Sequence, residues 1–206
     1  MFSFKSITIL FLCFASVGIN ASAQSLSVGA KVGAPLNDSF AGTIFSSTDL
    51  ISKTRPYTIG PSVEWMFSPY LGVQADALYK RTGYTVGLFG FNTSTKFNNW
   101  EFPLLLKTRF SGESVGAFAD GGLALRYVDG LTSYSALATS LNQPLQLTHP
   151  WGHGVAVGGG VSMKWAMLHF EPELRYTRWI PGDSSIPSFL SNRNQIEYLL
   201  GVRFGK

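Results

Sequence analysis

The chain has 206 residues, of which 45% are hydrophobic, 14% aromatic and only 14% charged, with a formal net charge of +4. The charged fraction is below the roughly 25% that a soluble domain usually has. Disordered chains contain few apolar residues, so the high apolar fraction excludes disorder. The 22 Gly and 10 Pro disfavour a helical bundle, because both residue types interrupt helices. The basic residues are scattered rather than gathered on one face, which argues against nucleic-acid binding. The composition favours one β domain.

The first 23 residues have the pattern of a secretory signal peptide. A short apolar stretch follows Lys5 and gives way to small residues that end at Ala23. This stretch is shorter than the roughly 20 apolar residues that a membrane-spanning helix needs. We therefore expect a signal peptide over 1–23 and a β-barrel domain over 24–206. Cleavage would remove Cys13, the one cysteine, so the exported domain would have no disulfide.

Apolar and polar residues then alternate with period two along eight segments. In the first segment Leu26, Val28 and Ala30 alternate with Ser27 and Gly29. Only a β-strand separates such a set onto two faces, so each segment is predicted as a strand. In chain order the predicted strands cover 26–36, 57–67, 71–80, 100–110, 115–128, 155–165, 168–176 and 196–204.

The connections between these strands alternate between short and long. The short ones cover 68–69, 111–114 and 165–166, and the long ones cover 37–55, 83–96, 129–151 and 180–193. An even number of strands with tight turns at one rim and long loops at the other is typical of bacterial outer-membrane barrels. The sequence therefore predicts an all-β fold, an eight-stranded antiparallel up-and-down transmembrane β-barrel with short periplasmic turns and long extracellular loops. Tyr134, Leu137, Ala138 and Leu141 have helical spacing and predict a short helix in one loop.

The polar faces of the strands carry nearly equal numbers of acidic and basic residues. A soluble lipocalin-type barrel points charges to water and needs no such balance, whereas a closed interior needs its charges paired. Eight strands enclose just enough space for side chains to fill, so no wide pore is expected. The predicted ion-pair network of the lumen comprises Lys31, Glu64, Asp76, Lys80, Glu101, Lys107, Arg109, Asp120, Arg126, Lys164, Glu171, Glu173, Arg175, Glu197 and Arg203.

Aromatic residues gather at both ends of the predicted strands, where the two membrane interfaces would lie. Amphipathic rings prefer the headgroup level, so two membrane girdles are predicted. The girdle at the tight turns comprises Trp65, Phe67, Phe110, Trp165 and Phe204, and the girdle at the loops comprises Tyr57, Tyr79, Trp100, Tyr127, Trp151, Tyr176 and Trp179. Pro103 and Pro172 lie within predicted strands, and because proline cannot donate to the ladder we expect a bulge at each.

Three segments resemble a known family. Residues 101–107, Glu-Phe-Pro-Leu-Leu-Leu-Lys, resemble a strand of the PorT-like outer-membrane β-barrel family, a relative of the OmpA-type transmembrane domain. Residues 29–33 and 194–204 are similar to the two ends of that family. The resemblance implies insertion by the outer-membrane assembly machinery, which usually recognises a terminal aromatic residue, here followed by Gly205 and Lys206. It implies no catalytic residues.

Candidate catalytic and metal-binding residues are few. His149 and His153 have a spacing that suits a metal on a helix, but Pro150 argues against a helix there, so no metal site is predicted. Ser162, His169 and Glu171 have the residue types of a nucleophile, base and acid, which a lipid-modifying enzyme would need. All three point to the lumen in the predicted register, and a structural ion-pair network is the preferred interpretation.

The sequence leaves three functions open. We expect an integral protein of the bacterial outer membrane, with a structural or interaction role through its extracellular loops and no catalytic activity. The alternatives are an outer-membrane lipid-modifying enzyme and a soluble secreted lipocalin-like ligand binder. The expected partners are membrane lipid, the assembly machinery and envelope or surface molecules that contact the loops. No nucleic acid, metal or cofactor is expected. Glycines 158–160 have no phosphate-loop context and are expected to make room for bulky neighbours.

Overall fold

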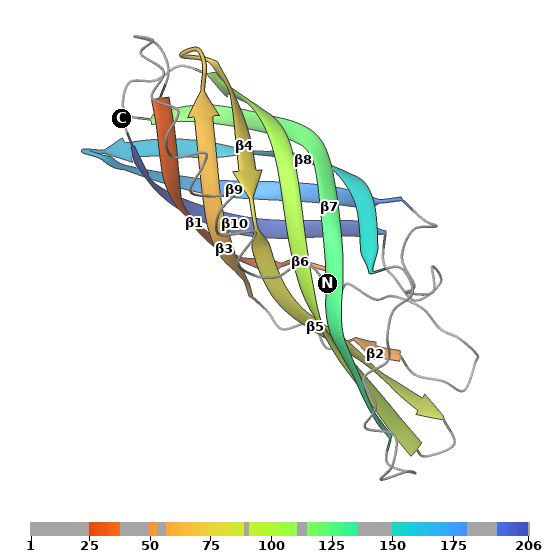
Figure 1. The fold of residues 1–206 in the computed structure, drawn as a ribbon. Helices are drawn as coiled ribbons and strands as arrows, with labels where there is room; N and C mark the ends of the chain where they lie inside the picture. The colour runs from red at the N-terminus through yellow and green to blue at the C-terminus, as the bar shows by residue number, and fades with distance from the viewer. Residues whose placement is uncertain are drawn as a thin grey trace, which may run out of the picture.

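The computed structural model describes residues 25–37, 50–52, 57–88, 91–110, 115–135, 150–180 and 193–205. The strands are β1 (Ser25–Pro35), β2 (Leu50–Ser52), β3 (Thr58–Met66), β4 (Leu71–Asp76), β5 (Leu78–Leu88), β6 (Phe91–Phe110), β7 (Val115–Ser135), β8 (Trp151–Trp165), β9 (Leu168–Trp179) and β10 (Asn194–Gly205). Figure 1 shows them wound into a tilted cylinder. No helix in the described ranges is long and apolar enough to cross a membrane.

The barrel wall is closed and has eight strands. Each strand pairs antiparallel with the next, and β1 closes the ring by pairing with β10 on one side and β3 on the other. We count β4 and β5 as one wall strand, because both pair with β3 and β6 and only Ala77 separates them. The short β2 pairs with β5 and is no part of the ring. The predicted eight-stranded fold is confirmed.

The two rims of the barrel differ. We name the rim with the turns at 67–70 and 166–167 the turn side, and the opposite rim the loop side. At the turn side, the Leu71 amide donates to Ser68 Oγ over 2.9 Å, which ties the turn between β3 and β4. Ala166 adopts a left-handed φ of 55° in the two-residue turn between β8 and β9. The predicted turn 111–114 lies outside the described residues, as do most of the loops 37–55, 129–151 and 180–193.

One predicted loop is a pair of strands. The segment 83–96 was expected to be a long connection, but β5 continues to Leu88 and β6 begins at Phe91. Residues 92–96 are polar and give no apolar alternation. Tyr84, Val86 and Leu88 do alternate with Gly83, Thr85 and Gly87, but they take the parity of Lys80 and so break the phase of the preceding strand. Both strands are held by backbone pairing, which needs no continuous pattern. β7 likewise continues to Ser135, so Tyr134 belongs to a strand rather than to the predicted helix. The rest of that predicted helix lies outside the described residues.

The extension of β5, β6 and β7 carries the sheet beyond the barrel wall. β6 has 20 residues and β7 has 21, whereas about 9–11 residues suffice for a strand to cross a bilayer. Figure 1 shows the three strands reaching past the others, with β2 at the edge of β5. The loop side of the molecule therefore begins with a projecting sheet rather than with loops alone.

The expected bulges at Pro103 and Pro172 do not occur. The register is continuous where Pro103 faces Ala124 on β7 and where Pro172 faces Leu200 on β10. On its other side each proline lies in a short gap of the ladder, with equal numbers of residues on the two strands. Proline has no N–H to donate to the adjacent strand. Because the ladder between the two strands is interrupted at the gap, no ladder hydrogen bond is lost there. The only irregularity in the pairing of β6 with β7 lies between Lys96 and Asn98.

Two of the three consecutive glycines of β8, Gly158 and Gly160, make room for side chains inside the barrel, as predicted, whereas a Cβ on Gly159 would meet only backbone atoms. A Cβ on Gly160 would lie 2.0 Å from the Pro172 carbonyl oxygen and 2.9 Å from Phe118 Cζ. A Cβ on Gly158 would lie 2.6 Å from Asp120 Oδ1. Both positions are thus filled by neighbouring groups.

Replacing Gly160 with alanine is expected to lower the free energy of unfolding by about 1–3 kcal/mol, because the added methyl group overpacks the interior. Gly201→Ala is the matched control, since its Cβ would meet the nearest atoms at 3.6 Å. That change should leave stability unchanged or raise it by about 0.4–1 kcal/mol. Urea unfolding in detergent micelles measures both, and equal losses would contradict the packing argument.

Candidate functional site: the charged interior

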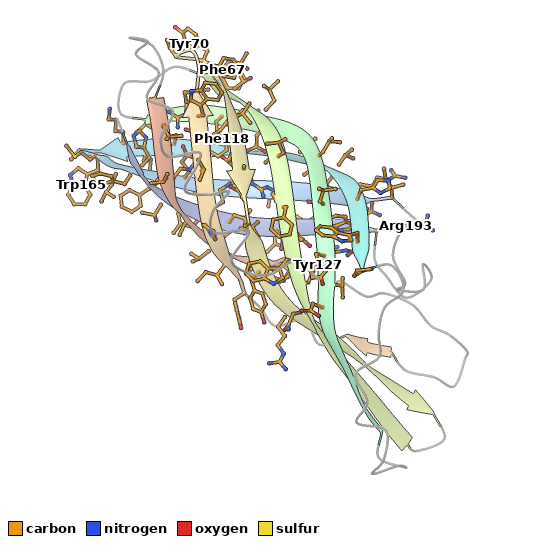
Figure 2. The ribbon with its side chains drawn as sticks, viewed as in Figure 1. Phe67, Tyr70, Phe118, Tyr127, Trp165 and Arg193 are labelled. Carbon is orange, nitrogen blue, oxygen red and sulfur yellow. The ribbon has the colours of Figure 1, made fainter. Side chains whose placement is uncertain are left out.

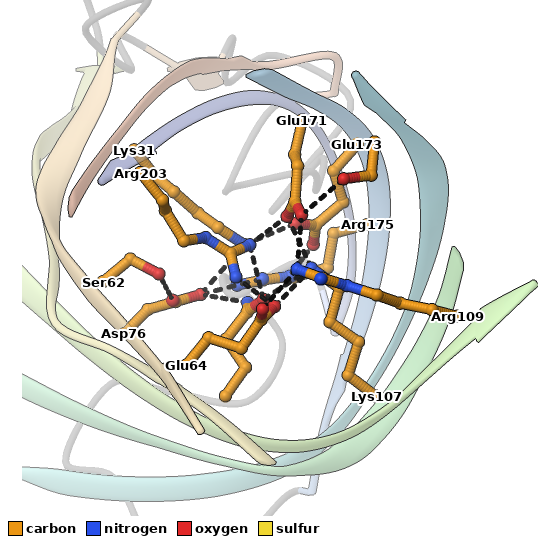
Figure 3. Close-up of polar contacts among 12 residues, drawn as sticks. Lys31, Ser62, Glu64, Asp76, Lys107, Arg109, Glu171, Glu173, Arg175 and Arg203 are labelled. Atoms are coloured by element: carbon orange, nitrogen blue, oxygen red, sulfur yellow. Dashed lines mark hydrogen bonds and ion pairs between the residues drawn. The ribbon is translucent and has the colours of Figure 1, made fainter. Parts of the chain in front are cut away.

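Alternate residues of every wall strand point into the barrel and form a charged interior. Lys31, Lys107, Glu171 and Arg203 have 0% of their surface exposed, although their side chains are long and charged. Figure 3 looks into this interior and shows charged side chains converging from opposite parts of the wall. Charge burial of this kind is tolerated only when the charges are paired and hydrogen-bonded. Three clusters of paired charges meet this condition.

In the turn-side cluster three cations form ion pairs with two carboxylates. Its members are Glu64, Lys107, Arg109, Glu171 and Arg203. Lys107 Nζ lies 2.8 Å from Glu64 Oε2 and 2.5 Å from Glu171 Oε2. Arg203 forms ion pairs with both carboxylates, Arg109 also contacts both, and its side chain is 23% exposed. These contacts join β3, β6, β9 and β10 across the lumen.

The middle cluster balances two cations against two carboxylates, and its members are Lys31, Asp76, Glu173 and Arg175. Arg175 lies 2.8 Å from Asp76 Oδ2 through Nη2 and 2.6 Å from Glu173 Oε1 through Nε. Lys31 pairs with the same two carboxylates. Ser62 Oγ donates to Asp76 Oδ1 over 2.6 Å. This cluster ties β1 and β4 to β9.

Gln74 connects the turn-side and middle clusters. Its carbonyl oxygen accepts hydrogen bonds from Arg203 over 2.9 Å and Lys107 over 3.3 Å. Its amide nitrogen donates to Asp76 Oδ2 over 3.1 Å. A neutral amide suits this place because it offers an acceptor to the cations and a donor to the carboxylate.

The loop-side cluster is centred on Lys80, whose ammonium lies 2.8 Å from both Glu101 Oε1 and Glu197 Oε1. Asn99 donates to Glu101 over 3.1 Å and Thr58 donates to Glu197 over 3.0 Å. All five side chains are buried.

Two cations of the interior also lie over aromatic faces. Arg126 is 4.4 Å from the centre of the Trp179 ring, and Lys107 of the turn-side cluster is 4.0 Å from the centre of the Phe118 ring. Such contacts stabilise cations that are withdrawn from water.

Two members of the predicted network differ from their neighbours. Lys164 shares the inward parity but is exposed, because it lies in the last pleat of β8 before the two-residue turn at the rim. Asp120 is buried, yet neither of its carboxylate oxygens has a hydrogen-bond partner in the described part of the chain. Across the space left by Gly158 it faces Glu173. The other predicted members lie buried or half-buried inside the barrel, each with an ion-pair or cation–π partner.

Four polar residues of the network were not singled out from the sequence: Thr58, Ser62, Gln74 and Asn99. All four are neutral, so a prediction based on charged residues does not include them. Strand parity could have found them, since Ser62 alternates in phase with Glu64 and Gln74 in phase with Asp76. They supply the donors and acceptors that paired charges still need.

The three residues with catalytic chemistry do not form a nucleophile–base pair. Ser162 Oγ donates to Glu171 Oε1 over 3.0 Å, and Glu171 is also held by the cations of the turn-side cluster. His169 is buried, and its Nε2 has no hydrogen-bond partner among the described residues. His149 lies outside the described residues. Within the described ranges, no group of three His, Cys, Asp or Glu could hold a metal ion.

The outer face of the barrel is apolar. Large aliphatic side chains stand exposed along the wall, for example Leu26, Leu104, Leu123, Val157 and Leu174. A charged interior and an apolar exterior contradict the soluble lipocalin-like alternative, which needs the opposite polarity.

The structure places the predicted aromatic residues near the two rims. Trp65, Phe67, Phe110, Trp165 and Phe204 are exposed at the turn side, while Tyr57, Tyr79, Trp100, Tyr127 and Tyr176 are exposed or half-buried toward the loop side. Figure 2 shows Phe67 and Trp165 at one end and Tyr127 toward the other. Trp179 does not belong with them: it is 3% exposed, because it shares the inward parity of Arg175 and Thr177.

A family model for the outer membrane protein β-barrel domain matches residues 9–204. The chain belongs to the outer-membrane β-barrel family. This family membership agrees with the inverted polarity of the two faces, which only a lipid-embedded barrel requires. The narrower likeness to PorT-like and OmpA-type barrels stays a prediction.

Solved structures of outer-membrane proteins share the architecture. The crystal structure of the outer membrane protein OprG from Pseudomonas aeruginosa has a TM-score of 0.54 and 15% identity, with 91% of this chain and 96% of that chain covered. Neisserial surface protein A has a TM-score of 0.52 and 16% identity, with 90% and 99% covered. At these identities the likeness shows the fold alone. No curated protein matches the sequence.

Proposed function

We propose that this outer-membrane barrel is a non-enzymatic scaffold, with a closed interior that makes it rigid and a loop side that contacts envelope or surface partners. The observation that carries the proposal is the set of ion pairs that crosses the lumen. The pairs between Lys107 of β6 and Glu171 of β9, and between Arg175 of β9 and Asp76 of β4, join strands that are not neighbours in the ring.

A filled interior argues against transport and against ligand storage inside the barrel. To open a path, charges withdrawn from water would have to separate, and breaking buried pairs costs several kcal/mol. The arrangement of Ser162 with Glu171 gives no support to lipid modification. What remains available for contacts is the loop side, where β5, β6 and β7 project beyond the wall. Rigid barrels commonly present functional loops in this way.

The proposal includes the route by which the protein reaches the membrane. Residues 1–23 act as a cleaved signal peptide, and the assembly machinery inserts the barrel with Phe204 near its end as the recognised aromatic residue. The signal peptide would direct secretion, and the apolar wall would hold the inserted barrel in lipid.

Recordings in planar lipid bilayers test the closed interior. Protein is purified from the outer membrane of expressing cells, its mass is checked for the loss of 23 residues, and it is reconstituted beside a wide-pore porin as a positive control. We expect no stable conductance steps, because the three clusters occupy the lumen. Large, stable openings of this barrel would overturn the proposal, and an uncleaved mass would overturn the signal peptide.

A further inference from the structure

A layer of buried polar side chains lies at the loop-side end of the lumen, and we name it the mouth layer. Its members are Asn99, Arg126, Trp179 and Gln195, which are 2%, 6%, 3% and 3% exposed. Both polar atoms of the Gln195 amide lack a hydrogen-bond partner among the described residues, as do Asn99 Oδ1, Arg126 Nε and Trp179 Nε1. Buried polar atoms are ordinarily paired, so a layer of unpaired ones requires an explanation.

The mouth layer lies directly beyond the loop-side cluster. On the loop side of that cluster, Gln195 is two residues from Glu197 on β10, and Asn99 is two residues from Glu101 on β6. Lys80 joins the two glutamates over 2.8 Å each, and Asn99 Nδ2 donates to Glu101 over 3.1 Å. These short contacts cross the lumen, so Asn99 and Gln195 stand on two sides of Lys80, within the reach of one small molecule.

Arg126 and Trp179 complete the layer from the other strands. Arg126 of β7 is the cross-strand partner of Glu101, and its guanidinium lies 4.4 Å from the centre of the Trp179 ring. Trp179 is the last residue of β9, the strand next to β10. Between β7 and β9, the buried positions of β8 at this level are Gly152 and Gly154, which have no side chain. The mouth layer is therefore built by β6, β7, β9 and β10.

The unpaired atoms of the mouth layer include both donors and acceptors. Gln195 Nε2, Arg126 Nε and Trp179 Nε1 carry N–H donors, whereas Gln195 Oε1 and Asn99 Oδ1 are acceptors. Leaving buried polar atoms unpaired costs free energy, and a molecule that supplies their partners regains it. Hydroxyl groups meet this need, because each hydroxyl both donates and accepts.

The charges beside the mouth layer are balanced, which disfavours an ion. Lys80 and Arg126 are matched by Glu101 and Glu197. An anion would meet the two carboxylates, and a cation would meet the ammonium and guanidinium groups. We propose that the mouth layer binds a neutral sugar, whose hydroxyl groups pair with the Gln195 amide and its neighbours. This inference rests on the proposed function, which assigns partner contacts to the loop side, and it needs no path through the filled lumen.

Saturation-transfer difference NMR of the folded barrel purified from the outer membrane tests this proposal. The micelles are of lauryldimethylamine oxide, which has no sugar headgroup. The probes are glucose, galactose and mannose, with glucuronic acid and glucosamine as charged analogues. We expect a neutral hexose to bind, and its charged analogues to bind about tenfold or more weakly, because a buried charge would lack a partner. The methyl glycoside of that hexose also binds if the source is the end of a glycan chain, and fails if the source is the free sugar.

Two glutamine variants separate the site from the interior network. Gln195→Leu removes the unpaired amide and should weaken hexose binding about tenfold, the loss expected for about two hydrogen bonds. It should not lower the urea concentration at which the barrel unfolds, because this amide has no partner in the described part of the fold. Gln74→Leu is the matched control, since its amide bonds Arg203, Lys107 and Asp76. It should unfold at lower urea but keep hexose binding.

A third variant tests the donor of the tryptophan. Trp179→Phe keeps an aromatic ring beside Arg126 but removes the N–H group, and it should weaken hexose binding severalfold. Heat-modifiable mobility on a gel confirms that each variant is folded.

Three outcomes would overturn the proposal. The absence of binding by all three hexoses would show that the mouth layer takes no sugar. Equal binding of the charged analogues would show that the layer does not select a neutral ligand. Unchanged binding by Gln195→Leu would place the sugar elsewhere. The scaffold function fails separately, through stable conductance in planar bilayers, so a closed barrel without hexose binding would overturn this inference alone.

Discussion

Replacing Glu171 with glutamine is expected to lower the free energy of unfolding by about 3–5 kcal/mol, the usual cost of removing one partner from a buried charge cluster. Three cations, Lys107, Arg109 and Arg203, contact this carboxylate. In the variant Glu64 would be the one carboxylate of the turn-side cluster left to neutralise them. The side chain keeps its volume and a carbonyl oxygen for Ser162, so the change isolates the charge. Urea titration of the barrel in lipid vesicles, followed by tryptophan fluorescence, measures the loss.

Asp120→Asn is the matched control for this prediction. It removes a carboxylate charge from the same interior, but Asp120 has no hydrogen-bond partner among the described residues and faces another carboxylate. We expect the free energy of unfolding to stay the same or to rise. A loss as large as that of Glu171→Gln would mean that stability depends on the total interior charge rather than on specific pairs.

Replacing Leu123 with arginine is expected to cost about 2–4 kcal/mol, because a cation would then face the hydrocarbon core of the membrane. Leu123 is 65% exposed on the outer face of β7, near the middle of the part that pairs with β8. The change leaves the charged interior untouched. The same unfolding measurement must be made in lipid, since detergent micelles do not impose a fixed hydrocarbon thickness.

Val115→Arg controls for depth on the same strand and the same face. Val115 is 59% exposed at the turn-side end of β7, where an arginine reaches the headgroups, and the expected cost is only about 0–1 kcal/mol. If both variants lost equal stability, the apolar wall would not be the surface in contact with lipid.

Local sequence pattern is enough to predict the class of fold and the face that most wall side chains take. Period-two alternation is a local property of extended backbone, so Glu64 and Lys107 could be placed inside the barrel without any knowledge of their partners. The same parity would have placed Trp179 inside, had β9 been followed to its end. Strand ends were the weak point, because the apolar alternation changes phase in β5 and stops in β6, while backbone pairing continues beyond it.

The pairs themselves were decided by the tertiary structure. Arg203 meets Glu64 across 139 positions of sequence, and Arg175 meets Asp76 across 99. Such meetings depend on how far each strand is shifted along its neighbour around a closed ring, and no local pattern records that shift. Nothing in the pattern distinguishes Asp120, which has no hydrogen-bond partner among the described residues, from Asp76, which has several ion-pair partners. Parity fixes which face a side chain takes, whereas closure of the barrel fixes what that side chain meets.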